Sequence, residues 1–113
     1  MCGIAGVLGT QPKPEAIAAS LKVLRHRGPD GDGVYRGDRV TLVHTRLSII
    51  DLTRAGDQPM EDPETGVVIV YNGEIYNMLE LREELNSDRF FSRTDTEVIL
   101  RLYLRYGIES VAR

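Results

Sequence analysis

The only cysteine of the chain stands at position 2, directly after the initiator methionine. An α-amine has a reference pKa of about 7.7 to 8.0, and a thiol has one of about 8.5. If Met1 is removed, the freed amine of Cys2 can take the proton of its own thiol, so one residue supplies nucleophile and base. A lone cysteine is more often a small buried hydrophobe, but this position favours a catalytic thiol.

Four further residues could act on a substrate. Asn72 and Gly73 form either a tight hairpin turn or a pair of donors to a developing oxyanion, and the dipeptide alone favours the turn. Arg46 lies among residues typical of a β-strand. A guanidinium there either forms an ion pair at a strand edge or binds a carboxylate through two hydrogen bonds. Asp95 begins a helix, where capping and the helix dipole alone favour an acid. The scheme needs neither His26 nor His44, and both are expected to be structural.

Composition limits the class of protein. The chain has 113 residues, 42% apolar and 27% charged, with a net charge of −3, as expected of one small globular domain. Neither nucleic acid nor a membrane is expected as a partner. A single cysteine makes a reducing cytoplasm the default compartment. The sequence has no CxxC, no cluster of histidines and acids and no glycine-rich phosphate loop, so no metal or cofactor is expected in this segment.

Hydrophobic periodicity predicts strands and helices in an α+β arrangement. Residues 3–8 read as a buried strand, and residues 40–51 as one strand or two with a bend. Between them we expect a helix after Pro14 and a loop over 25–33. The expected packing residues are Ile4, Val7 and Leu8 in the strand and Ile17, Leu21 and Leu24 in the helix.

The second half of the sequence predicts one more strand and two more helices. Residues 67–71 form a buried strand that ends at Asn72-Gly73, and an amphipathic helix follows. The clearest helix spans 94–107, with a capping box and a stop at Gly107. The apolar faces are Met78, Leu81 and Leu85 in the first helix, and Val98, Ile99, Leu102, Tyr103 and Tyr106 in the second.

Six sequence blocks coincide in one known arrangement, and they cover nearly the whole chain. The chain closely resembles the glutaminase domain of the class II (N-terminal nucleophile) glutamine amidotransferases. Its RHRGPDGDG block resembles the corresponding segment in the branch of glutamine-hydrolysing asparagine synthetases. The blocks are MCGIAGV (1–7), RHRGPDGDG (25–33), HTRLSIIDL (44–52), GDQPM (56–60), YNGEIYN (71–77) and RTDTEVIL (93–100).

The resemblance implies a role for each candidate residue. The thiolate would attack the carboxamide of glutamine, ammonia would leave, and water would hydrolyse the γ-glutamyl thioester to glutamate. The implied roles are nucleophile and base for Cys2, binding of the substrate carboxylate for Arg46, binding of its ammonium for Asp95 with Glu74, an oxyanion hole for Asn72 and Gly73, and packing beside the site for Leu47 and Ile49.

The resemblance also implies a larger protein. Residues 1–113 would be the N-terminal portion of a type-2 glutamine amidotransferase domain, an Ntn-hydrolase-like α/β/β/α sandwich truncated on its C-terminal side. A synthetase domain absent here would use ATP and Mg²⁺ to activate aspartate and would receive the ammonia, in a cytoplasmic protein that is expected to form a homodimer. The 113 residues alone are expected to be marginal in stability and activity.

Two alternatives remain open at this point. The parent protein could pass ammonia to an acceptor other than aspartate, because acceptor recognition would lie in the synthetase domain. The chain could also be a non-catalytic fragment that binds glutamine without turnover.

Overall fold

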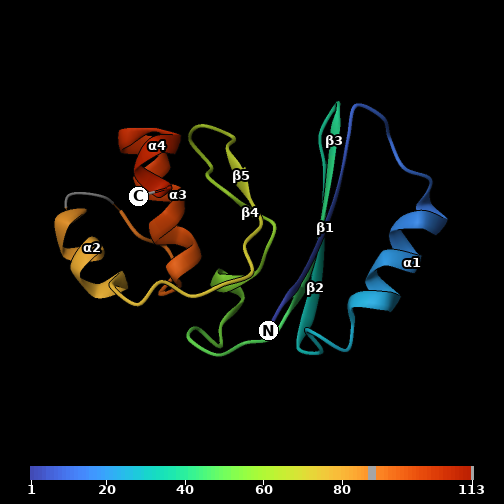
Figure 1. The fold of residues 1–113 in the computed structure, drawn as a ribbon, viewed down its shortest axis with the longest axis horizontal. Helices are drawn as coiled ribbons and strands as arrows, with labels where there is room; N and C mark the ends of the chain where they lie inside the picture. The colour runs from blue at the N-terminus through green and yellow to red at the C-terminus, as the bar shows by residue number, and fades with distance from the viewer. Residues whose placement is uncertain (87–88, 113) are drawn as a thin grey trace.

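A computed structural model describes residues 1–86 and 89–112 and shows a mixed α+β fold, as the sequence predicts. Helix α1, a three-stranded sheet, the β4–β5 hairpin, and α3 with α4 follow one another along the long axis (Figure 1). The elements in chain order are β1 (Gly3–Leu8), α1 (Pro14–Leu24), β2 (Gly31–Arg36), β3 (Val40–Arg46), a 3₁₀ turn (Arg54–Gly56), β4 (Met60–Glu61), β5 (Val68–Ile69), α2 (Met78–Glu84), α3 (Asp95–Tyr106) and α4 (Ile108–Val111).

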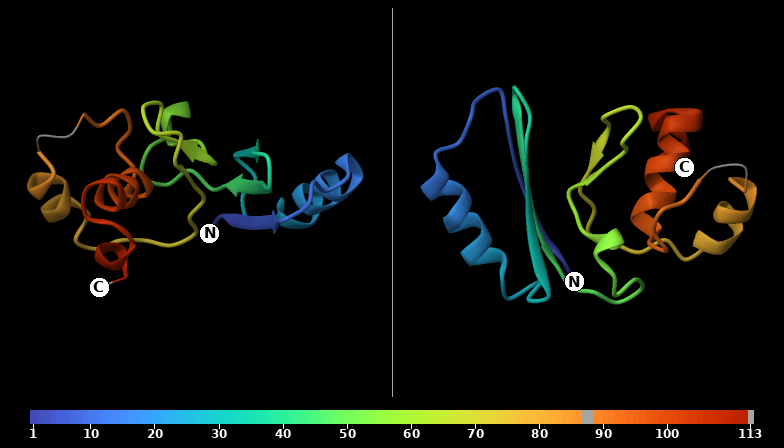
Figure 2. Two further views of the ribbon diagram at one scale, coloured as in Figure 1. Left: turned by 90° about the horizontal axis from the view of Figure 1, so that it is seen from above. Right: turned by 180° about the vertical axis from the view of Figure 1, so that it is seen from behind.

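The larger sheet is antiparallel, with β3 between β1 and β2. Gly3 of β1 pairs with Thr45 of β3, and Gly31 of β2 pairs with Arg46. Helix α1 lies along one face of this sheet (Figure 2), where the Thr45 hydroxyl donates to the carbonyl of Leu24 over 3.0 Å. The opposite face is therefore free to carry the rest of the chain.

The expected burial of β1 is wrong. Ile4 is 45% exposed, Leu8 is 80% exposed, and Val7 is exposed as well. Strand β1 is an edge strand with β3 as its one sheet neighbour, and the residue that packs against Leu24 of α1 is Gly3. The apolar residues of β1 therefore predict the strand correctly, but Ile4, Val7 and Leu8 are not part of the core.

Three of the expected boundaries also need correction. Strand β2 begins at Gly31, inside the stretch expected to be a loop, and pairs with β3 along its whole length. Strand β3 ends at Arg46, so the β-branched residues after it are not in a strand. The expected buried strand over 67–71 is only Val68–Ile69, and it is half-buried because its sheet partner is the two-residue β4.

The helices agree better with the sequence. Helix α1 starts at Pro14 and buries Ile17, although Leu21 and Leu24 are only half-buried. Helix α3 begins after Thr94, whose hydroxyl accepts from the N–H of Glu97, and ends at Gly107 with φ +81°, which favours glycine. Its Tyr103 and Tyr106 are exposed, contrary to expectation.

A small apolar core lies between α2 and α3. Leu85, Val98 and Leu102 form its buried centre, and the half-buried side chains around it are Met78, Leu81, Phe90 and Val111. The core is thus built from the helical half of the chain. The stripe predicted for the helix around Met78 is confirmed, since all three of its members pack here.

A charged network joins the β4–β5 hairpin to α3. The guanidinium of Arg101 pairs with Asp62 at 2.9 Å and with Glu97 at 3.3 Å. Glu97 does not complete the expected capping box, because its carboxylate accepts from the main-chain N–H groups of Phe91 and Ser92 instead. The hydrogen bonds and ion pairs of these two buried carboxylates offset the cost of taking them out of water.

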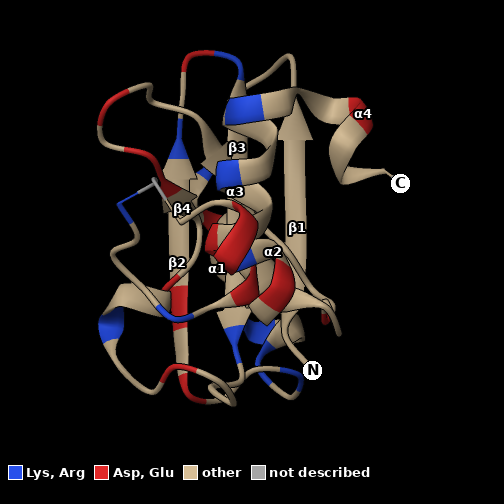
Figure 3. Cartoon of the chain, turned by 90° about the vertical axis from the view of Figure 1, so that its left-hand side faces the viewer, with Lys and Arg blue, Asp and Glu red and all other residues tan. Residues whose placement is uncertain are grey.

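The surface carries both signs of charge. On the face that Figure 3 shows, lysines and arginines are interspersed with acids, in line with the net charge of −3. Among the described residues, no helix combines the length and the apolar character that crossing a bilayer requires.

Truncation of Leu85 should separate core packing from surface effects. Leu85 is fully buried and Leu79 is 69% exposed on the same helical segment. Leu85→Ala should lower the free energy of unfolding by about 2–5 kcal/mol, whereas Leu79→Ala should stay within about 0.5 kcal/mol of the wild type. Denaturant unfolding measures both, and equal losses would contradict the described core.

Candidate active site

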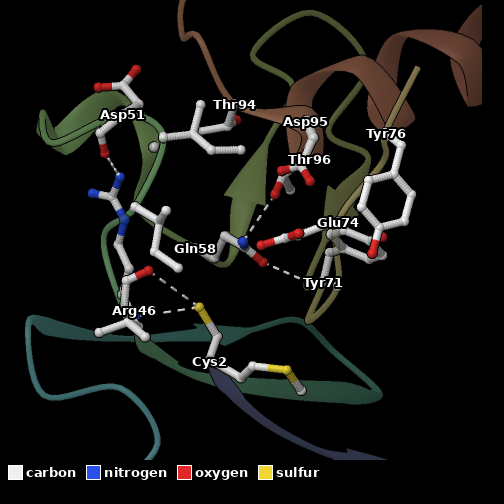
Figure 4. Close-up of a pocket in the computed structure, with 16 residues that line it drawn as sticks. Cys2, Arg46, Asp51, Gln58, Tyr71, Glu74, Tyr76, Thr94, Asp95 and Thr96 are labelled. Carbon is white, nitrogen blue, oxygen red and sulfur yellow. Dashed lines mark hydrogen bonds between the residues drawn. The ribbon is translucent and has the colours of Figure 1, made fainter. Parts of the chain in front are cut away.

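One pocket of about 280 Å³ lies at the N-terminal end of β1. Pockets that enclose drug-sized ligands span about 300–1,000 Å³, so this one suits a smaller molecule. Residues far apart in the sequence meet there (Figure 4). They are Met1, Cys2, Arg46, Leu47, Ile49, Ile50, Asp51, Gly56, Gln58, Tyr71, Gly73, Glu74, Tyr76, Thr94, Asp95 and Thr96.

The thiol of Cys2 lies against the chain that leaves β3. The main-chain N–H of Leu47 donates to Cys2 Sγ at 3.3 Å, and the carbonyl of Leu47 is 3.8 Å from the sulfur. Arg27 Nε donates to the carbonyl of Cys2 at 3.0 Å. Cys2 is half-buried, whereas Met1 is 70% exposed. Loss of Met1 would therefore free the Cys2 nitrogen at the pocket with little disturbance of packing.

Arg46 is buried and bonds the loop that follows it. Its Nη1 donates to the carbonyl of Thr53 at 2.7 Å and to Asp57 Oδ1 at 2.8 Å, and its Nη2 donates to the carbonyl of Asp51. The guanidinium points toward Asp51 in Figure 4. A guanidinium has five N–H donors, so two remain for a ligand. Bonding of the loop also explains why the strand ends here.

Asp51 connects this loop to the start of α3. Its carboxylate accepts from the hydroxyl and N–H of Thr53 at 2.6 and 2.8 Å and from the N–H of Arg93 at 2.9 Å. The hydrogen bonds from Thr53 and then Arg93 lower the pKa of Asp51 to about 2. Asp51 thus links Arg46, through its carbonyl, to the residues just before α3, through its carboxylate.

Two carboxylates face the pocket from the other side. Asp95 is buried and accepts from the N–H of Ile75 at 3.2 Å, while Glu74 is exposed. Burial raises the pKa of Tyr71, and the charges of Asp95 and Glu74 raise it further. The pocket therefore presents a cation on one side and negative charge on another, with a thiol between them, a pattern suited to a zwitterionic ligand.

The residues proposed from the sequence meet in this pocket with one exception. Cys2, Arg46, Leu47, Ile49, Gly73, Glu74 and Asp95 line it, whereas Asn72 is half-buried beside Gly73 and is not among the lining residues. Sequence reasoning did not single out Asp51, Gln58, Tyr71, Tyr76, Thr94 or Thr96. All six lie within the quoted blocks, but no spacing rule distinguishes them from their neighbours as site residues.

Neither histidine lines the pocket. His26 is exposed, and its Nδ1 lies 2.8 Å from the carbonyl of Val23. His44 is fully buried and neither ring nitrogen has a hydrogen-bond partner. Burial lowers the pKa of His44 to about 4, and the nearby main chain of Tyr71 opposes this shift. His44 is therefore neutral in the folded chain at neutral pH.

Within residues 1–86 and 89–112, no three histidine, cysteine or acidic side chains gather closely enough to hold a metal ion. The pocket is lined by one thiol, by charged side chains and by the hydroxyl groups of two tyrosines and two threonines.

Known proteins are similar to this chain along nearly its whole length. A family model described as a glutamine amidotransferase domain matches residues 1–113. Glutamine-hydrolysing asparagine synthetase 1 of Arabidopsis thaliana is 43% identical over 98% of this chain, and synthetase 2 of Oryza sativa subsp. japonica is 44% identical over 98%. The nodule enzyme of Pisum sativum, of the same name, is 40% identical over 95%. The chain spans only 19–20% of the length of these relatives.

The buried His44 should make stability depend on pH. The unfolded chain protonates His44 below its ordinary pKa of 6.5, and the folded chain does so only near 4. The contribution of neutral His44 to the free energy of unfolding should thus be fully present above pH 6.5 and be lost as the pH falls toward 4. At about 1.4 kcal/mol for each pKa unit, the loss is about 3 kcal/mol. Asp51, whose pKa is lowered, loses its contribution only at lower pH.

Denaturant unfolding between pH 7 and about 4.5 measures this slope. His44→Gln should flatten it, whatever its effect on absolute stability, and His26→Gln should leave it unchanged. An unaltered slope in His44→Gln would show that His44 is not the titrating group.

Proposed function

The chain belongs to the glutamine amidotransferase domain family, and from this premise we propose that its pocket hydrolyses the side-chain amide of glutamine with Cys2 as nucleophile. One observation carries the proposal. The single thiol of the chain shares a small pocket with the buried guanidinium of Arg46 and the carboxylates of Asp95 and Glu74, and these are the charges that an α-amino acid needs around its α-carbon.

The charged residues orient the substrate. Asp95 and Glu74 bind the ammonium of glutamine, and the two remaining N–H groups of Arg46 bind its carboxylate. Leu47 and Ile49 pack against the aliphatic part of the substrate. Fixing the α-carbon in this way holds the side-chain amide next to the sulfur. The attack then becomes a step within one oriented complex and needs no further encounter.

Removal of Met1 creates the base. The freed α-amine of Cys2 takes the thiol proton, and the thiolate forms a bond to the amide carbon of glutamine. Asn72 and the N–H of Gly73 donate to the oxyanion of the tetrahedral intermediate. The C–N bond then breaks as the ammonium of Cys2 returns a proton to the leaving nitrogen, and ammonia departs. Water, deprotonated by the same amine, hydrolyses the thioester to glutamate.

The proposed architecture is an Ntn-hydrolase-like α/β/β/α sandwich. The order of layers in Figure 1 supports it, since a helix, a sheet, a second pair of strands and further helices succeed one another. In such an arrangement the nucleophile at the start of β1 lies between the two β layers, where the pocket is.

The ammonia would serve a larger protein. The relatives are named asparagine synthetases and are about five times as long as this chain. We therefore propose that the whole protein transfers the ammonia to activated aspartate, in the cytoplasm and as a homodimer. ATP and Mg²⁺ would belong to a separate synthetase domain, because the described residues offer neither a glycine-rich phosphate loop nor a cluster of metal ligands.

Replacement of the thiol tests the mechanism directly. Cys2→Ala should reduce ammonia release from glutamine at least about 10³-fold in the whole protein, since the pocket has no second thiol. Intact-mass measurement of the wild type should show that Met1 is absent. A glutamine analogue with an electrophilic side chain should label Cys2. Release of ammonia by Cys2→Ala at the wild-type rate would refute the proposal.

Neutralisation of Asp95 tests the charged clamp. Asp95→Asn keeps an acceptor for the N–H of Ile75 but removes the charge that would face the substrate ammonium. The KM for glutamine should rise about 10–100-fold, the effect of losing a hydrogen bond to a charged group, with a smaller change in kcat. Asp38→Asn, an exposed acid beyond the pocket, is the matched control, and an equal KM in both variants would contradict the assignment.

A further inference from the structure

The segment proposed to form the oxyanion hole has few main-chain contacts of its own. Residues 71–75 lie outside the strands and helices. Two of their N–H groups have partners, namely Tyr71, which donates to Gln58 Oε1 at 2.6 Å, and Ile75, which donates to Asp95 Oδ2 at 3.2 Å. Within the described part of the chain, the N–H groups of the intervening residues 72–74 have none. Two side chains therefore bracket the segment.

Gln58 is the less expected member of this pair. Its side chain is buried beside the pocket, and its Nε2 donates to the hydroxyl of Thr96 at 3.0 Å. Thr96 follows Asp95 in the first turn of α3. The amide of Gln58 thus spans from the segment 71–75 to the helix that carries Asp95, and Figure 4 shows both hydrogen bonds.

The main chain of Gln58 rests on the sheet. A Cβ atom at Gly33 of β2 would overlap the carbonyl oxygen of Gln58, so glycine is required for this approach. Gly33 pairs with His44 of β3, and β3 pairs with β1, where Cys2 precedes the first residue. The sheet that carries the nucleophile therefore also packs against the main chain of Gln58.

We propose that Gln58 is a positioning residue that holds the main chain of Tyr71 and so aims the donors of Asn72 and Gly73 at the carbonyl attacked by Cys2. The inference rests on the proposed function. Gln58 itself touches no reacting atom in this scheme. The carbonyl oxygen of its side-chain amide accepts from Tyr71, and the NH₂ group donates to Thr96. The amide therefore joins the segment 71–75 to α3.

The chemistry explains why displacement of this segment matters. Donors of an oxyanion hole act only within about 2.7–3.1 Å of the developing charge, and a misplacement of about 1 Å can cost about 10²-fold in rate. Loss of the Gln58 bond frees Tyr71 while Ile75 stays bonded to Asp95. The ammonium site then persists while the oxyanion donors drift, so kcat should suffer and KM should not.

The test compares three variants of the whole protein. Gln58→Met has a similar volume but neither hydrogen bond. Gln58→Glu keeps an acceptor for Tyr71. Gln11→Met is the matched control, because Gln11 also hydrogen-bonds through its side chain, to Thr41 and to the carbonyl of Asp38, but lies outside the pocket. The readouts are amide hydrogen exchange of residues 70–76 and the kinetics of glutamine hydrolysis.

We expect Gln58→Met to lose exchange protection at Tyr71 and to lower kcat about 10–100-fold with KM within about 3-fold of the wild type. Gln58→Glu should keep the protection, and Gln11→Met should match the wild type in both readouts. Unchanged protection in Gln58→Met, or a raised KM with kcat retained, would overturn the proposal. Failure of the proposed function is seen separately, as a wild type that releases no ammonia from glutamine.

Discussion

The arrangement of the pocket depends on one buried guanidinium. Arg46 is taken out of water at the end of β3, and the cost of burying its charge is offset only if its donors are bonded. The carbonyls of Asp51 and Thr53 and the carboxylate of Asp57 meet that requirement. The chain must therefore turn back on itself instead of continuing as a strand. That turn brings Leu47 against the thiol of Cys2 and Ile49 to the pocket.

The same residue accordingly has a structural and a proposed functional role. Three of its five donors hold the loop, and those that remain are oriented by the ones already bonded. A binding group fixed in this way loses little conformational entropy when a ligand arrives. Asp51 extends the arrangement to α3, since its carboxylate joins the same loop to the N–H of Arg93. The two charged ends of the proposed clamp are thus held by one set of hydrogen bonds.

Local patterns predicted the parts of the fold that local forces decide. Thr94 and Gly107 delimit α3 because capping and a left-handed residue act within one turn. Strand β2 was missed, since its Gly-Asp-Gly start resembles a turn and only pairing with β3 makes it extended. The candidate site residues came from motifs, whereas Asp51 and Gln58 act on partners 42 and 38 residues away. No periodicity reports such contacts. The exposure of Ile4 and Leu8 was unpredictable for the same reason, because hydrophobicity does not tell an edge strand from a central one.

The pairing of β1 with β3 has a consequence for how this domain could fail. Successive side chains of a strand point to opposite faces, so a shift of one residue in the pairing of Gly3 with Thr45 would turn Cys2 toward α1. A shift of two residues would keep the face but move the thiol by roughly 6–7 Å, beyond reach of Leu47. A chain with such a shift would keep its other elements but would not hold the thiol of Cys2 at the pocket. Reactivity of the thiol toward a substrate-like reagent is therefore a measure of folding fidelity, finer than any measure of secondary structure content.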